Sequence, residues 1–148
     1  MKSLTEGNCF HHVAIRARDF DVSVRFYTQG LGLRVHFQGS VPGLVDRAAY
    51  LDTRDGRFVE IFGPGSLVQA EGPRRAPEEA VREGAVLHFC LRATDVDASY
   101  HRAIAAGGVS RLAPVARRLC EDPVTDMRVA FVVGPSGEVI ELLQSDQL

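Results

Sequence analysis

The sequence predicts an α+β domain made of two tandem βαβββ modules. Residues 12–19 (HVAIRARD) recur at 88–95 as HFCLRATD, and such internal repetition indicates a duplicated unit. Each copy then ends with a turn and a strand pattern in which one glutamate stands among apolar residues, at 55–62 and 136–143. A helix pattern separates the first strand of each copy from the later ones. We therefore expect a single domain over residues 1–148.

Module 1 is expected at about residues 10–63, in the order strand, helix and three strands. Its first strand, at 11–17, is apolar and β-branched. Asp19 can cap the N-terminus of a helix at 22–29, and glycines end that helix. The last two strands flank Arg54-Asp55-Gly56, a strong hairpin turn. The three later strands are predicted at 33–38, 47–53 and 57–62, with a Gly/Pro loop at 39–43.

Module 2, at about residues 85–146, repeats this order. A strand at 86–92 precedes Asp95, which can cap a helix at 96–106. A polar, proline-containing loop is expected at 119–126. The three later strands are predicted at 110–117, 127–133 and 138–143.

Residues 64–84 are expected to connect the two modules. They are rich in Gly, Pro, Glu and Arg, with one helical turn predicted at 77–82. The length of this segment favours a link between units over a loop inside one unit.

The composition is typical of a globular protein in aqueous solution, with 45% hydrophobic and 24% charged residues. A net charge of −2 gives no support to binding of nucleic acid or of a membrane surface. No apolar run reaches the length of a membrane span, and the N-terminus lacks the apolar core of a signal peptide. Three cysteines without a CxxC motif do not indicate a disulfide framework. We expect a cytoplasmic protein that acts on a small molecule.

Two histidines and two glutamates occupy equivalent places in the two copies. His12 and His88 begin the first strands, and Glu60 and Glu141 stand on the closing strands. Imidazole and carboxylate groups are the ligands that first-row divalent cations use. An ionised glutamate among apolar neighbours is costly to bury unless a cation or an arginine pairs with it. The alternative is two hydrogen-bonded histidines and two rim glutamates without a metal. His11 is expected on the opposite strand face.

Three motifs make the chain similar to the vicinal oxygen chelate superfamily, which includes glyoxalase I, bleomycin-resistance proteins and extradiol dioxygenases. They are HVAI with FYTQGLG in residues 12–32, VEI at 59–61, and GPSGEVIEL at 134–142. The resemblance covers about residues 11–144. It implies two modules set edge to edge, with their sheets curling into a cup around one metal ion. It also implies a homodimer, in which the cup forms within one chain or from modules of different subunits.

The resemblance assigns the four metal ligands to His12, Glu60, His88 and Glu141, a set similar to that of bacterial glyoxalase I. It implies one divalent ion, and nickel, cobalt, zinc, manganese and iron all suit these ligands. Glutathione-using members carry an asparagine shortly after the second ligand. The asparagine of this chain is Asn8, so the donor thiol is another compound or none.

The function that these residues and the resemblance indicate is a metal-dependent lyase or isomerase of the glyoxalase I kind. It would act on a small α-hydroxycarbonyl or related chelating substrate by proton transfer through a metal-bound enediolate, with Glu60 or Glu141 as the proton carrier. One alternative is a non-catalytic drug- or metabolite-binding protein of the bleomycin-resistance kind. The other is a metal-dependent dioxygenase, which a fourth protein ligand disfavours because dioxygen and substrate need open positions.

Four further residues are candidates for substrate binding. Arg16 and Arg92 each follow a ligand histidine by four positions, and the resemblance gives Arg16 the role of holding a substrate carboxylate. A salt bridge across the module interface is the alternative, and we favour it for Arg92. Phe58 and Phe62 flank Glu60 on one strand face, where they either line the pocket or pack in the core. We favour the core for both.

Overall fold

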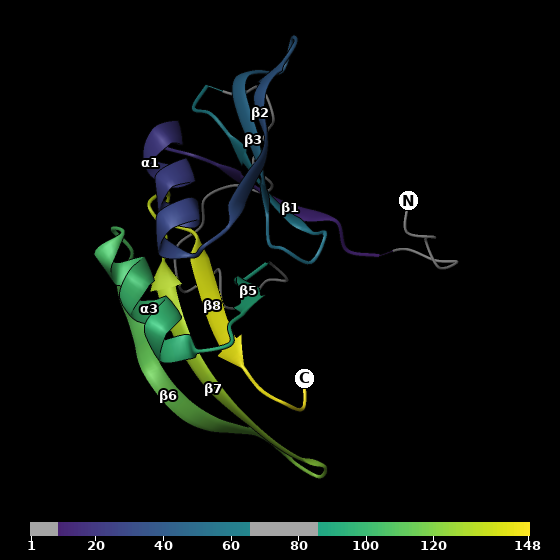
Figure 1. The fold of residues 1–148 in the computed structure, drawn as a ribbon, viewed down its shortest axis with the longest axis vertical. Helices are drawn as coiled ribbons and strands as arrows, with labels where there is room; N and C mark the ends of the chain where they lie inside the picture. Colours follow the sequence, from purple (N-terminus) through teal and green to yellow (C-terminus); the bar gives the residue numbers. More distant parts are fainter. Residues whose placement is uncertain (1–8, 66–85) are drawn as a thin grey trace, which may run out of the picture.

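A computed structural model describes residues 9–65 and 86–148. They form two four-stranded sheets, each with a helix on one face (Figure 1). The predicted connector lies almost wholly outside the described residues, and the helical turn at 77–82 lies entirely outside them. Within the described ranges no helix has both the length and the apolar character needed to span a membrane.

Module 1 has the predicted order of strand, helix and three strands. Its sheet runs β1-β4-β3-β2, with β1 parallel to β4 and the other neighbours antiparallel. The elements are β1 (His12–Arg16), α1 (Phe20–Arg25), the π-helical turn η1 (Phe26–Gly30), β2 (Arg34–Val41), β3 (Val45–Asp52) and β4 (Phe58–Phe62).

Module 2 repeats the same topology, which confirms the prediction of two βαβββ units. Its sheet runs β5-β8-β7-β6, and β5 is again parallel to its neighbour β8. The elements are β5 (Phe89–Arg92), α3 (Val96–Ala105), β6 (Val109–Glu121), β7 (Val124–Val133) and β8 (Val139–Gln144).

Both predicted helix caps are confirmed. The Asp19 carboxylate accepts a hydrogen bond of 2.9 Å from the backbone N–H of Val22. The Asp95 carboxylate does the same for Ala98, also at 2.9 Å. Each carboxylate satisfies a backbone donor that the first helical turn leaves unpaired, and each lies at the positive end of its helix.

An ion pair between helix and sheet is also duplicated. Arg47 on β3 donates to Asp21 on α1, with Nη2 to Oδ1 at 2.7 Å. Arg128 on β7 donates to Asp97 on α3 with the same atoms and the same distance. In each module the guanidinium hydrogen bond holds the pKa of the aspartate below its usual value. Because these pairs lie at the surface, they orient the helix more than they stabilise the fold.

The first helix differs from its prediction at both ends. It begins at Phe20 rather than at residue 22, directly after its cap. It then widens into η1, where the N–H of Leu31 donates to the carbonyl of Phe26 at 3.3 Å, five residues back. Hydrophobic spacing alone does not distinguish such a wide turn from an α-helix.

The prediction of a loop at 119–126 is wrong. β6 continues to Glu121 and β7 begins at Val124, so most of this segment is a paired hairpin around Asp122 and Pro123. The polar composition reflects exposure of the hairpin on both faces rather than loss of strand structure. In the same way β2 reaches Val41, inside the predicted Gly/Pro loop.

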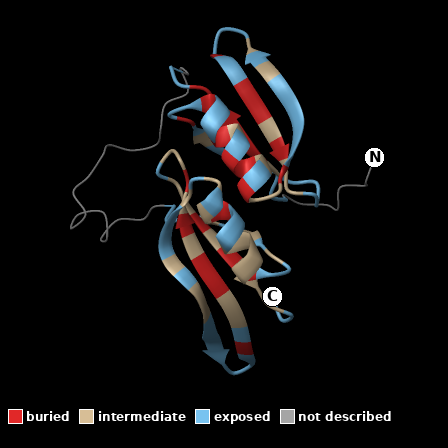
Figure 2. Ribbon diagram, turned by 60° about the vertical axis from the view of Figure 1, so that its left-hand side comes forward, coloured by how far each residue is buried: buried red, intermediate tan, exposed pale blue. Residues whose placement is uncertain are grey.

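The two modules share one hydrophobic core, formed where their helices and inner sheet faces meet (Figure 2). The end of η1 packs against α3 so closely that Gly30 has no room for a side chain. A Cβ there would lie 2.8 Å from the Cβ of Ala106. The two sheets are separate four-stranded units within the described residues.

Candidate metal centre

The first histidine–glutamate pair lies on the adjacent parallel strands β1 and β4. Glu60 stands opposite Ala14 in the register, so its carboxylate is close to His12, which shares a strand face with Ala14. The Nε2 atom of His12 is 3.2 Å from the Oε2 atom of Glu60. Glu60 is 7% exposed, although its strand neighbours are apolar. The imidazole is therefore a polar partner for a buried carboxylate.

The second pair has the same geometry, with Glu141 on β8 and His88 directly before β5, which begins three residues later than predicted. The Nε2 atom of His88 is 2.9 Å from the Oε2 atom of Glu141. The side chain of Glu141 is 13% exposed and that of His88 is 34% exposed. In each module the histidine thus lies beside the glutamate of its own copy, and a single ion held by all four residues remains a prediction.

The donor atoms of each pair suit a common divalent cation. Two ligands that each lie about 2.1 Å from an octahedral ion, at right angles, are about 3 Å apart. Both pairs have this spacing, so each can supply two of the four protein ligands expected for one ion. Within residues 9–65 and 86–148, however, no cluster of three or more His, Cys, Asp or Glu side chains is close enough to hold one ion. A single chain thus presents two half-sites.

Aromatic residues lie opposite each glutamate, and the sequence analysis missed them. Tyr50 on β3 is the register partner of Glu60, and Phe131 on β7 is the partner of Glu141. Their rings also make edge contacts with the histidines, at centroid distances of 5.7 Å for Tyr50 and His12 and 5.1 Å for Phe131 and His88. Pairing across the two predicted hairpins was the signal that could have found them.

Tyr50 makes the first half-site different from the second. Burial raises the pKa of the Tyr50 phenol, and a hydrogen bond to Glu60 and the charge of that carboxylate raise it further. The phenol therefore remains a protonated donor to Glu60. Phe131 has no such group, so the side-chain donor opposite Glu141 is the weaker Cys90 thiol.

The expectation that His11 lies on the strand face opposite to His12 is wrong. Its Nδ1 atom is 2.9 Å from Nδ1 of His12, and its ring contacts those of Tyr50 and Phe58 at 6.4 Å and 5.2 Å between centroids. Strand alternation fails here because β1 begins only at His12. His11 is therefore an additional polar group beside the first pair.

Cys90 stands opposite Glu141 in the register of β5 and β8. Although the residue is exposed at the sheet edge, partial desolvation raises the pKa of its thiol to about 12, with the charge and hydrogen bond of Glu141 as further causes. The thiolate is the reactive and metal-binding form of cysteine. Cys90 is therefore a neutral neighbour of the second pair and not a nucleophile.

The four predicted substrate residues lie in three different settings. Arg16 is exposed on β1, on the strand face that carries His12. Phe62 packs in a small buried cluster with Val45 and Ala48, in agreement with the core position that the sequence favoured. Phe58 and Arg92 both line a cavity between the modules, away from the other two.

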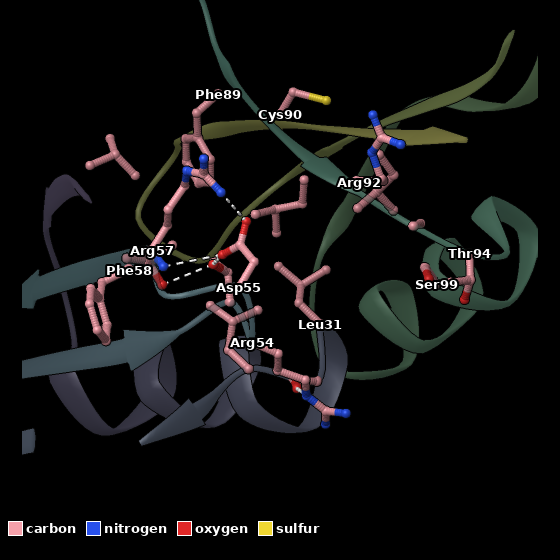
Figure 3. A pocket seen from close by; sticks show the side chains of 18 of the residues that line it. Leu31, Arg54, Asp55, Arg57, Phe58, Phe89, Cys90, Arg92, Thr94 and Ser99 are labelled. Carbon is pink, nitrogen blue, oxygen red and sulfur yellow. Dashed lines mark hydrogen bonds and ion pairs between the residues drawn. The ribbon is translucent and has the colours of Figure 1, made fainter. Parts of the chain in front are cut away.

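That cavity has a volume of about 720 Å³ (Figure 3). It lies between the β3–β4 turn, the segment after η1, and the stretch from β5 into α3. The four residues of the two histidine–glutamate pairs are not among its lining residues. The structure thus has two distinct candidate regions, the half-sites and this cavity.

Comparison with known sequences gives a consistent classification. A family model described as the Glyoxalase/Bleomycin resistance protein/Dioxygenase superfamily matches residues 10–142. The Bacillus subtilis (strain 168) protein YwbC, described as uncharacterized, is 27% identical over 137 residues, which cover 90% of this chain and 94% of YwbC.

Solved structures have the same fold. A glyoxalase I mutant from Zea mays superposes on 90% of this chain with a TM-score of 0.66 and 21% identity, and the chain spans 43% of that protein. SMU.1112c has a TM-score of 0.63 and 27% identity over 92% of this chain and 98% of its own. TioX from Micromonospora sp. ML1 has a TM-score of 0.62 and 19% identity, over 93% of this chain and 99% of the TioX chain. A shared fold does not by itself specify an activity.

Proposed function

Since this chain belongs to the Glyoxalase/Bleomycin resistance protein/Dioxygenase superfamily, we propose that it is a metal-dependent lyase or isomerase. Its substrate would be a small α-hydroxycarbonyl or related chelating compound, in which a proton moves between neighbouring atoms beside a carbonyl. The observation that carries the proposal is the duplicated pair, His12 with Glu60 and His88 with Glu141, at 3.2 Å and 2.9 Å. In both modules a nearly buried carboxylate lies beside an imidazole, and a bound cation would offset the cost of that burial.

The complete site would form between two copies of the chain. β1, which carries His12, and β5, which begins directly after His88, are edge strands of their sheets. Large apolar residues flank both strands in exposed positions: Phe10 is 61% exposed, and Val86 and Leu87 are 86% and 76% exposed. Exposed edges with apolar neighbours favour pairing with another chain. A homodimer that sets β1 of one subunit beside β5 of its partner would join the half-sites.

The four side chains would hold one divalent ion. When bound, such an ion supplies Lewis-acid stabilisation of negative charge on the substrate oxygens. Arg16 shares the face of His12 on β1 and is exposed, so it can reach an anionic group of the substrate. The half-buried aromatic rings of Tyr50 and Phe131 would limit the access of water to both pairs.

Glu141 is the better candidate for the proton carrier. Tyr50 donates to Glu60 and restrains it, whereas the register partner of Glu141 is the apolar Phe131. A carboxylate that accepts a proton from carbon must be able to turn toward it. Glu60 would thus remain a fixed ligand, and Glu141 would take the proton and return it to the neighbouring atom.

The first test is elemental analysis of protein purified without added metal. The proposal predicts bound divalent ion, and its removal with EDTA should abolish deuterium incorporation from D2O beside the carbonyl of dihydroxyacetone, followed by NMR. A metal-free protein that binds organic compounds without exchanging protons would instead be a binding protein, and would contradict the proposal.

The second test separates the two glutamates by metal saturation. Glu60→Gln should weaken metal binding, so that excess metal restores much of the exchange rate. Glu141→Gln should leave exchange at least about 100-fold slower even when metal is saturating, since general base catalysis contributes about 10² to 10⁴. The reverse pattern, with Glu60→Gln inactive and Glu141→Gln rescued, would assign the proton to Glu60.

A further inference from the structure

The cavity between the modules has a strongly basic mouth. Four arginines line it: Arg54, Arg57, Arg92 and Arg102. They come from the β3–β4 turn, from β5 and from α3, so both modules contribute to the lining, and Figure 3 shows the guanidinium groups of Arg54 and Arg92 on opposite sides of the cavity. All four are exposed rather than buried. Asp55 is the one carboxylate among the lining residues.

Only part of this positive charge is neutralised. Nη1 of Arg57 lies 2.7 Å from Asp55, which pairs these two residues. Arg54 uses Nε to donate to the carbonyl of Gly32 at 3.1 Å, which leaves its terminal nitrogens for other acceptors. Among the described residues, Arg92 forms no side-chain hydrogen bond or ion pair. An excess of guanidinium groups around a concave surface attracts and concentrates anions.

Arg102 has a similarly incomplete set of partners. Its Nη2 atom donates to the hydroxyl of Ser99 at 3.0 Å, and Ser99 also lines the cavity. A guanidinium has five N–H donors. Arg102 and Ser99 together therefore keep donors that a bound anion can use.

The floor of the cavity is apolar. Leu33, Val59 and Leu142 are buried there, at 7%, 1% and 2% exposure. Phe89 and Leu91 on β5 add half-buried hydrophobic surface. The cavity thus combines a hydrocarbon floor with a cationic rim, and its volume of about 720 Å³ lies within the range of small-molecule pockets.

We propose that this cavity binds a small organic anion with an apolar body and a carboxylate-like head. The body would lie on Leu33, Val59 and Leu142, and the head would meet the guanidinium group of Arg92 on one side of the cavity or that of Arg54 on the other. This site is separate from the histidine–glutamate pairs and needs no metal. It also explains why Arg92 and Phe58 lie away from Arg16 and Phe62.

The test uses three probes that divide the ligand into its parts. Octanoate carries both body and head, acetate carries the head, and 1-octanol carries the body. Their affinities are measured by isothermal titration calorimetry on full-length protein treated with EDTA, so that carboxylate cannot bind through a metal. Octanoate should bind at least about tenfold more tightly than 1-octanol, because a hydrogen bond to a charged group is worth about that factor. It should also bind at least about tenfold more tightly than acetate, because acetate lacks the apolar body.

The matched variants remove charge while keeping aliphatic bulk. Arg54→Met with Arg92→Met should weaken octanoate binding by at least about tenfold, which is the contribution of one hydrogen bond to a charged head. The affinity for 1-octanol should change by less than about threefold, since its binding has no charged head. Arg111→Met, on the exposed part of β6 outside the cavity, should leave both affinities unchanged.

Equal affinities of octanoate and 1-octanol for the wild-type protein would overturn the proposal. Equal losses in the Arg111 variant and in the double variant would do so as well. If the double variant does not fold, as judged by circular dichroism, each single variant is titrated instead. The octanoate affinity of the wild-type protein must also fall as salt is raised, and a salt-independent affinity contradicts a cationic rim.

Discussion

Tyr27 is fully buried where the two modules meet, and its phenol donates a hydrogen bond of 2.7 Å to Glu138. Burial raises the pKa of Tyr27 well above its usual value, and the adjacent Glu138 carboxylate raises it further. The folded protein therefore keeps this phenol neutral at a pH where the unfolded chain ionises it. The stabilisation is complete below about pH 10, the usual tyrosine pKa, and is lost as the pH rises above it.

We predict that the free energy of unfolding falls between pH 10 and pH 12 by up to about 1.4 kcal/mol per pH unit from this residue alone. Tyr27→Phe should remove that part of the slope. At pH 7 the same variant should be less stable by about 1 to 3 kcal/mol, because the half-buried Glu138 carboxylate loses its phenol donor. Urea unfolding followed by circular dichroism at each pH measures both effects.

Tyr100→Phe is the matched control. Tyr100 lies on α3, and its hydroxyl donates to Ser110 within module 2, away from the junction. This variant should retain the steep decline of the wild-type protein above pH 10. If Tyr27→Phe also retains it, the buried phenol is not the group that links stability to pH.

At the scale of elements, the contact between η1 and α3 fixes how the modules sit together. A Cβ at Gly30 would lie 2.8 Å from the Cβ of Ala106 and 3.4 Å from Cα of Ala103. Real Cβ atoms are not found at the first distance, so one helix end would have to move. A larger residue at position 30 therefore affects the arrangement of the modules and not only the local turn.

We predict that Gly30→Ala lowers the free energy of unfolding by about 1 to 3 kcal/mol through overpacking. Ala106→Gly, which removes the opposing methyl group, should recover at least half of that loss in the double variant. Chemical denaturation of the four proteins in the cycle gives the coupling energy. Additive effects within about 0.5 kcal/mol would mean that the two residues do not meet.

Local patterns in the sequence were sufficient for most elements. The repeated aspartates at 19 and 95 predicted both helix caps, and the alternation of apolar residues predicted all eight strands. The width of η1 and the length of β6 were not predictable in this way. The width of η1 depends on the hydrogen bond from the N–H of Leu31 to the carbonyl of Phe26. The length of β6 depends on its pairing with β7, which lies later in the chain.

The same distinction applies to the candidate site at the scale of the whole molecule. Each histidine meets its glutamate because parallel neighbouring strands bring them together, and the repeat predicted only that both modules would share one strand order. The position of Tyr50 opposite Glu60 depends on the register of the β3–β4 hairpin, and the sequence did not predict that register residue by residue. The relative position of the two pairs depends on the packing of η1 against α3, and no local pattern encodes that contact.

The central claim is that two chains complete each metal site, and complementation between two inactive variants tests it most directly. One variant carries His12→Ala with Glu60→Gln, and the other carries His88→Ala with Glu141→Gln. In a heterodimer with sites between subunits, one site joins the intact module 1 of one chain to the intact module 2 of its partner. If sites form within a chain, every site in that heterodimer lacks half of its ligands.

The measurement is a cobalt(II) titration of the heterodimer, purified with a different affinity tag on each chain, followed by visible absorption. We predict one site with wild-type affinity and spectrum per heterodimer, and none in either variant homodimer. A heterodimer that binds cobalt no better than the homodimers, or a wild-type chain that binds it tightly while monomeric, would contradict the account.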